Sequence, residues 1–148
     1  MRLYSVRVVL GILLLAVFGM QLLTPTIVAS SIDASVEIKP ETLNLKKNGV
    51  ITAFIEFLDP SHNVSDIDLE SIELHVDDAV GSVVPLRCVV ADGKLIAKFD
   101  ASDVADLILL GHMQPIPPQD NQLKDLVVEG MVKGEPFEGS DRIRVILP

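Results

Sequence analysis

Aromatic and sulfur-containing side chains are scarce in this sequence. It has no tryptophan, one tyrosine and a single cysteine, Cys88. A lone cysteine excludes an intramolecular disulfide, and the small aromatic set requires a core built mainly from valine, isoleucine and leucine. We interpret Cys88 as a small buried hydrophobe within the segment Leu86-Arg87-Cys88-Val89-Val90. The absence of tryptophan also removes the usual stacking platform of a carbohydrate site.

Positive charge is scarce as well. The chain has 12 lysines and arginines against 21 aspartates and glutamates, which gives a net charge of −9 at pH 7. Arg2 and Arg7 precede the first acid, Asp33, so loss of those two positive charges lowers the net charge from −9 to −11. Such a surface repels nucleic-acid phosphates and anionic membrane faces. We therefore predict no nucleic-acid partner, and either a self-repelling soluble surface or a binder of cations.

The first thirty residues form the one long hydrophobic run. The two arginines lie in a short basic region, and an apolar segment follows over residues 8–23. Small residues at 29–31 then provide a cleavage site for signal peptidase. This order is typical of a secretory signal peptide. Because the basic end stays inside, the rest of the chain is expected outside the cytoplasmic membrane.

An uncleaved anchor is the alternative interpretation of the same segment. Residues 8–32 carry no charge, and about 20 apolar residues suffice to cross a bilayer as a helix. Pro25 would end that helix early, which favours cleavage. We predict that residues 1–31 are a signal peptide or a signal anchor with a hydrophobic helix. The exported domain, residues 32–148, is then either secreted or held at the outer face of the membrane by residues 8–32.

Beyond residue 35 the hydrophobic pattern has a period of two, which is typical of half-buried strands. Turn signals such as Lys47-Asn48-Gly49 and Ala91-Asp92-Gly93-Lys94 separate the strands. The alternating segments include 36–38, 43–45, 50–58, 72–76, 83–90, 95–99, 123–132 and 140–147.

One segment has helical spacing instead. Asp100 is its expected N-cap, apolar residues of 101–108 share one face, and Gly111 is the expected stop. Three prolines predict a loop over 113–120. The domain is therefore predicted to be mainly β, an antiparallel β-sandwich of about seven strands with one short crossover helix.

Four segments carry a family resemblance: VEIKPETLNL at 36–45, VSDID at 64–68, KFD at 98–100 and GEPFEGSDRIRV at 134–145. Together they resemble a small β-sandwich module, Ig-like or cohesin-like, of archaeal and bacterial exported and cell-surface proteins. The resemblance implies no general activity. Members often carry an acidic calcium loop before the KFD strand, but here only Asp92-Gly93 stands in that place.

No catalytic or cofactor motif is present in the sequence. No Gly-x-Ser-x-Gly surrounds a serine, no glycine-rich phosphate loop occurs, and His62, His75 and His112 match no zinc spacing. We assign no catalytic residue, no cofactor and no metal site. Calcium is the one cofactor considered, because it requires several oxygen ligands. Its candidate ligands are Asp77, Asp78 and Asp92.

The sequence thus predicts a non-enzymatic, exported structural or protein-interaction module at the cell surface. Its partner would be an unknown surface or extracellular protein, and its only membrane contact would be the N-terminal segment. Two alternatives stay open: a calcium-binding or cation-binding surface domain that uses acidic loops, and an uncharacterised hydrolase with a dispersed carboxylate site.

Overall fold

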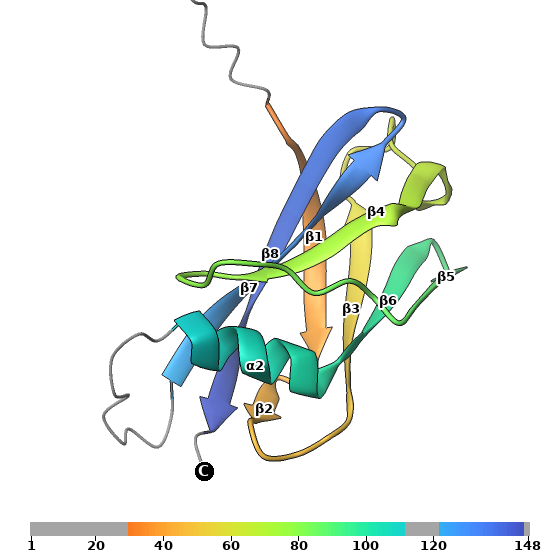
Figure 1. The fold of residues 1–148 in the computed structure, drawn as a ribbon. Coiled ribbons are helices and arrows are strands. Elements are labelled where there is room, and N and C mark those ends of the chain that lie inside the picture. Colours follow the sequence, from red (N-terminus) through yellow and green to blue (C-terminus); the bar gives the residue numbers. More distant parts are fainter. Residues whose placement is uncertain (1–29, 112–121, 147–148) are drawn as a thin grey trace, which may run out of the picture.

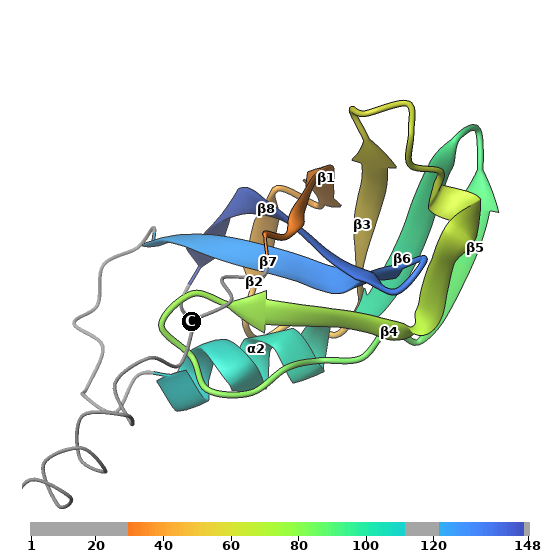
Figure 2. The same cartoon turned by 90° about the horizontal axis from the view of Figure 1, so that it is seen from above.

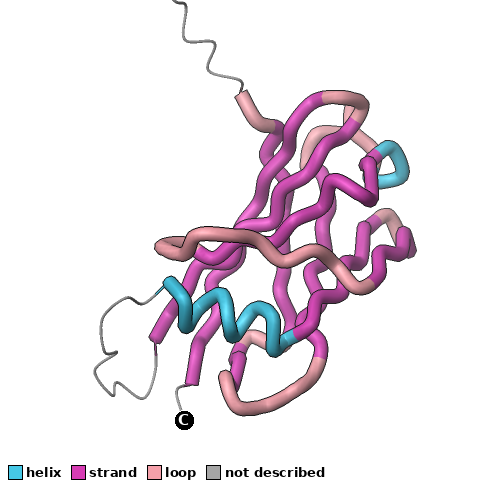
Figure 3. Tube along the Cα trace, in the orientation of Figure 1, coloured by secondary structure: helices cyan, strands magenta, loops and turns pink. Residues whose placement is uncertain are grey.

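The computed structural model describes residues 30–111 and 122–146. These residues form strands and one α-helix, coloured separately in Figure 3. Nearly all of the predicted export segment, with its hydrophobic helix, lies outside the described residues, as does the predicted loop at 113–120. Both stay predictions. No helix in the described residues is long and apolar enough to cross a membrane.

Within the described residues, eight strands, one 3-10 turn and one α-helix follow one another (Figure 1). They are β1 (Ile32–Lys39), β2 (Thr42–Asn44), β3 (Val50–Phe57), η1 (Val64–Asp66), β4 (Ile67–Val76), β5 (Arg87–Ala91), β6 (Lys94–Asp100), α2 (Ala101–Gly111), β7 (Gln122–Val132) and β8 (Glu135–Ile146).

The strands form two sheets that share β1, as Figure 2 shows from above. One sheet has the order β1-β3-β6-β5, and the other has the order β4-β7-β8 with β2 and the start of β1 beside β8. This is the ABED and CFG order of an immunoglobulin-type sandwich, with β1 and β2 as two parts of a split first strand. Helix α2 connects β6 of one sheet to β7 of the other. The predicted mainly-β sandwich with one crossover helix is confirmed.

The prediction of a purely antiparallel sandwich is wrong, because β8 has parallel neighbours. β1 pairs with β8 in parallel at Ile32 and Asp33, and then pairs antiparallel with β3. Pro40 ends this strand pairing, because proline has no backbone N–H to donate to a ladder. β2 then pairs with β8 in parallel again, from Thr42 to Asn44. The split first strand explains both the mixed sheet and the eighth strand.

The predicted strand over 83–90 is shorter in the structure. β5 begins only at Arg87, and Val83 forms a single bridge with Leu74. Pro85 lies between them and cannot donate to a ladder, so pairing stops there. The result is a loop over residues 77–86 between β4 and β5. Gly111, expected just beyond the helix, is instead its last residue.

The core between the sheets is mainly aliphatic, as the composition predicts. Leu95, Ala97 and Phe99 of β6, which share one face of the alternating segment 95–99, are fully buried. Glycine is required where β1 approaches β8, because a Cβ on Gly139 would overlap the carbonyl oxygen of Ala34. This close approach brings the first strand into the β4-β7-β8 sheet.

Candidate functional site

A row of four carboxylates crosses the outer face of the β4-β7-β8 sheet. Glu73 of β4 is opposite Glu129 of β7, Glu129 is opposite Glu138 of β8, and Glu138 is opposite Asp33 of β1. Residues directly opposite each other in a sheet point to the same side. The four side chains therefore form one line across four strands, which we name the acidic row.

The acidic row is electrostatically unfavourable in an isolated domain. Like charges directly opposite each other on neighbouring strands destabilise a sheet. Within residues 30–111 and 122–146, no lysine or arginine forms an ion pair with any of the four acids. Elsewhere on β7 and β8 such a pair exists, because Arg142 donates two hydrogen bonds to Asp125. The four acids of the row thus lack a positively charged partner such as the one that Asp125 has in the same sheet.

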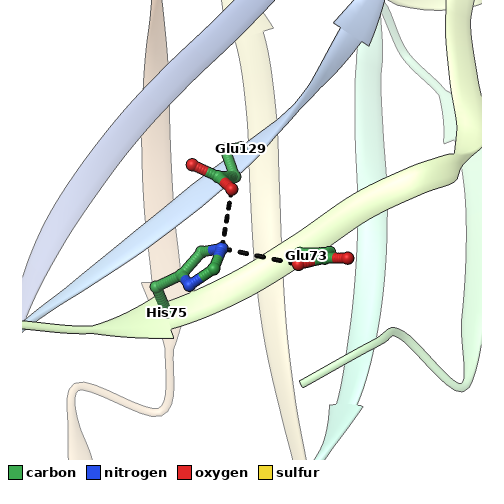
Figure 4. Close-up of side chains that lie close together, drawn as sticks. All are labelled: Glu73, His75 and Glu129. Carbon is green, nitrogen blue, oxygen red and sulfur yellow. Dashed lines mark ion pairs between the residues drawn. The ribbon is translucent and has the colours of Figure 1, made fainter. Parts of the chain in front are cut away.

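His75 lies beside Glu73 and Glu129 of the acidic row, and Figure 4 shows these three side chains. His75 is two residues from Glu73 on β4, so both side chains leave the same face of the strand. Its Nε2 atom is 2.7 Å from Oε1 of Glu129 and 3.6 Å from Oε2 of Glu73. In the described part of the chain, these three residues are the one group of three potential metal ligands whose donor atoms converge.

The other ring nitrogen fixes the orientation of His75. Nδ1 is 3.1 Å from the carbonyl oxygen of Gly81. A carbonyl oxygen only accepts, so Nδ1 carries the proton and donates. In the neutral ring, Nε2 then carries the free lone pair. Nε2 is shielded from solvent and makes no hydrogen bond in the described structure, because the short approach of Glu129 lacks hydrogen-bond geometry.

A second unusual surface lies on the other side of Gly81, where the loop 77–86 runs along α2. The loop packs closely there, since a Cβ on Gly111 would lie 2.9 Å from the Ala79 Cβ. Aliphatic side chains nevertheless point to solvent: Val80 is 95% exposed, Val84 65% and Leu110 75%.

The loop and the helix together line a shallow, open groove. Its volume is about 310 Å³, and Val84, Leu107 and Leu110 line it together with two carboxylates of α2, Asp103 and Asp106. We name the groove, with exposed Val80 beside it, the loop–helix surface. Exposed apolar clusters with a polar rim are typical of protein-interaction sites.

The three aspartates considered as calcium ligands lie in different turns. Asp77 and Asp78 follow β4, whereas Asp92 lies between β5 and β6. Asp78 and Asp92 have φ values of 69° and 52°, a conformation that aspartate tolerates in turns. Each of these two therefore has a backbone role. The described structure does not bring the three together as one ligand set.

Cys88 and His62, which were also considered from the sequence, pack against hydrophobic neighbours. Cys88 is half-buried against the core, and burial raises the pKa of its thiol, which disfavours the reactive thiolate. His62 packs on the Phe57 ring with a centroid distance of 5.6 Å. His112 lies outside the described residues.

The sequence did not predict the Glu73–His75–Glu129 cluster. The alternation over 72–76 places Glu73 and His75 together on the outer face, which was a usable signal. Glu129 is 56 positions from Glu73 in the printed sequence, and only the register of β4 with β7 places them opposite each other.

Comparisons with known proteins leave the family open. No family model matches the chain, and no curated protein matches it. It is similar in structure to an ICAM-5 D1–D4 ectodomain fragment, with 12% identity and a TM-score of 0.41, over 84% of this chain and 26% of that chain. It is also similar to the endo-β-1,4-mannanase from Thermotoga petrophila, with 14% identity and a TM-score of 0.37, over 78% and 20% of the two chains.

The chain thus spans about a quarter or less of the length of each of these structures. Likeness at this level carries no functional conclusion. The resemblance of the sequence to exported modules accordingly stays a prediction, while the β-sandwich itself is observed.

Proposed function

We propose that this protein is a non-catalytic module that binds another protein outside the cytoplasmic membrane. The observation that carries the proposal is the loop–helix surface, where Val84 and Leu110 are exposed at the groove and Val80 is exposed on the same loop. Exposed aliphatic side chains gain free energy when a partner removes them from water, by about 25 cal/mol for each Å² buried. Loops on a rigid β-scaffold are also frequent binding sites.

The rim of the groove indicates the chemistry of the partner. Asp103 and Asp106 of α2 line it, and the whole chain carries a net charge of −9. A complementary partner presents an apolar side chain flanked by lysine or arginine, because opposite potentials steer association and exclude wrong partners. An anionic polymer or an anionic lipid surface would be repelled by the same charges.

The extracytoplasmic location rests on the sequence of the first 31 residues. The basic start, the apolar run and the small residues before Ile32 support export. Mass spectrometry of the mature protein from its own cells tests this part. A mature N-terminus near Ser31 in the external fraction, or an intact segment in the membrane fraction, supports export. An intact chain in the cytosol contradicts it.

Site-specific photo-crosslinking tests the interaction. A photoreactive residue at Val84 is expected to give a discrete adduct with one surface protein of the source cells. The matched control places the same residue at Leu58, which is 78% exposed but lies beyond the end of β3, away from the groove.

Charge reversal then decides whether the groove is responsible. Asp103→Lys with Asp106→Lys should abolish the Val84 adduct, because the complementary rim is lost. Both side chains are exposed, so the fold should tolerate the change. Equal adducts at Val84 and Leu58, or an adduct that persists after the charge reversal, would contradict the proposed surface.

A further inference from the structure

We propose that Glu73, His75 and Glu129 bind one divalent transition-metal ion of the zinc type. The proposal goes beyond the interaction function and does not depend on it. Three observations carry it: the orientation of His75, the convergence of the donor atoms, and the opposition of two glutamates across β4 and β7.

The orientation of His75 is that of a metal ligand. A ligating histidine commonly donates its second ring N–H to a backbone carbonyl or a carboxylate, which leaves the other nitrogen free to bind. Here the Gly81 carbonyl accepts from Nδ1 at 3.1 Å, and Nε2 has no hydrogen-bond partner in the described residues. Nε2 lies 2.7 Å from Oε1 of Glu129, which is also an acceptor, so a cation bound by both atoms removes the repulsion of their lone pairs.

The distances suit a small ion. Bonds of about 2.0–2.1 Å in a tetrahedral site place neighbouring donor atoms about 3.3 Å apart. The distances from Nε2 to the two carboxylate oxygens, 2.7 Å and 3.6 Å, lie on either side of that value. Donors of one metal point at a shared third position and not at each other. This agrees with the missing hydrogen-bond geometry between Nε2 and Glu129.

The choice of ion follows from the donor set. Imidazole nitrogen with two carboxylates suits zinc and its neighbours in the first transition series. Calcium prefers six to eight oxygen ligands, and a cluster with one nitrogen and two glutamates does not supply them. The three side chains come from two paired strands, which hold their backbones rigidly. The side chains are partly exposed, so water or a partner's donor can complete the coordination.

An ion at this position also compensates the acidic row. Glu73 and Glu129 are direct cross-strand neighbours, and Glu129 is in turn opposite Glu138. A bound divalent cation replaces the repulsion between Glu73 and Glu129 by attraction to a shared charge. The remaining two acids lie farther along the same row.

Zinc titration of the full-length chain tests the proposal. The protein is purified in mild detergent with a tag that lacks histidine and cysteine, and is stripped of metal with a chelator. Calorimetry, supported by competition with a chromophoric zinc indicator, should show one zinc bound per chain. Zinc should also raise the melting temperature. Calcium in the same titration should give neither effect.

Matched variants assign the ion to the cluster. His75→Gln and Glu129→Gln should each weaken zinc binding by about 100-fold or more, because a direct ligand is lost. His62→Gln and Cys88→Ser should bind zinc as the wild type does. Circular dichroism checks that each variant is folded. Glu73→Gln is the second, isosteric test if His75→Gln does not fold.

Several results would overturn the proposal. One is a wild-type chain that takes up no zinc, which would leave the cluster as a contact between side chains without an ion. Another is zinc binding that survives both His75→Gln and Glu129→Gln, or that is lost in Cys88→Ser, since the ion would then lie elsewhere. A calcium response equal to that of zinc would refute the assigned type of ion.

Discussion

The acidic row and the loop–helix surface differ in almost every physical respect. The row lies on four paired strands, and its side chains are charged and fixed in register. The loop–helix surface lies on a connecting loop and a helix end, and its most exposed side chains are aliphatic. One surface exposes charges of a single sign, whereas the other exposes groups that water disfavours.

Both regions nevertheless have a feature that does not favour a stable, isolated domain. Like charges opposite each other weaken a sheet, and exposed aliphatic clusters favour association. Local violations of this kind are expected where a protein binds something. The difference lies in the ligand that would relieve each of them. A cation relieves the acidic row, and a protein with an apolar side chain relieves the loop–helix surface.

Gly81 joins the two regions. Its carbonyl oxygen holds Nδ1 of His75, and the same loop carries Val80 and Val84. Its φ of 120° is one that other residues rarely adopt. A change at Gly81 should therefore reach both surfaces.

Removing the packing beneath the acidic row should have the largest effect. Phe137 is 1% exposed and contacts the Phe57 ring edge-on. Phe137→Ala should lower the free energy of unfolding by about 3–5 kcal/mol, because it leaves a cavity in the core. Chemical denaturation measures this. Val80→Ser on the loop–helix surface is the control and should change it by less than about 0.5 kcal/mol. If Phe137→Ala and Val80→Ser lower the free energy of unfolding equally, the two regions do not differ in rigidity.

The link between the regions can be broken at Gly81. Gly81→Ala should weaken zinc binding by about 10-fold to 100-fold, because the carbonyl that orients His75 is displaced. Zinc titration measures the change. Gly93→Ala is a matched control, since Gly93 also has a positive φ, of 75°, but lies in the β5–β6 turn. If both variants bind zinc equally well, the loop does not support the cluster.

The acidic row depends on β1 being held beside β8. Asp141 of β8 accepts a hydrogen bond from the backbone N–H of Ile38 at 2.7 Å. Asp141→Ala should destabilise the fold by about 1–3 kcal/mol, because that amide loses its acceptor near the core. Thermal or urea unfolding measures the effect. Asp141→Asn retains an acceptor oxygen and should recover much of the stability. If Asp141→Asn is as unstable as Asp141→Ala, the loss of stability comes from the missing charge.

Repulsion along the row can be measured directly in metal-free protein. Glu138→Gln should stabilise the fold by about 0.2–1 kcal/mol, because one of the opposed charges is removed. The gain should shrink at high salt, where exposed charges are screened. Glu70→Gln removes an exposed acid outside the row and should have little effect. A destabilising Glu138→Gln would mean that the row is compensated by other groups.

The smallest effect concerns Asp125, an acid of the same sheet that is paired with an arginine. Hydrogen bonds from Arg142 lower the pKa of the Asp125 carboxyl. A lowered folded-state pKa adds stability above the unfolded value of about 3.9, and this is lost as the pH falls through the folded value. Arg142→Gln should therefore reduce the acid sensitivity of unfolding slightly below pH 4. An unchanged pH profile would show that this exposed pair contributes nothing.

Much of the fold could be predicted from the sequence because its signals are local. Alternation predicted β3, β6 and β7, and the Asp92-Gly93 turn between β5 and β6 is present with both residues at positive φ. The helix was placed within a residue of its observed end. The split of the first strand was not predicted, because a proline shows where pairing stops but not which sheet the chain joins next.

The sequence by itself determined which side chains share a face in several of the strands, where the chain turns, and the excess of negative charge. Those properties depend on neighbouring residues and on composition. The tertiary structure alone decided that β8 has parallel neighbours and that Glu129 lies opposite Glu73 beside His75. A period of two specifies the face of a side chain but not its partner strand. Partner and register come from packing across the whole sandwich, and the candidate metal cluster exists only through them.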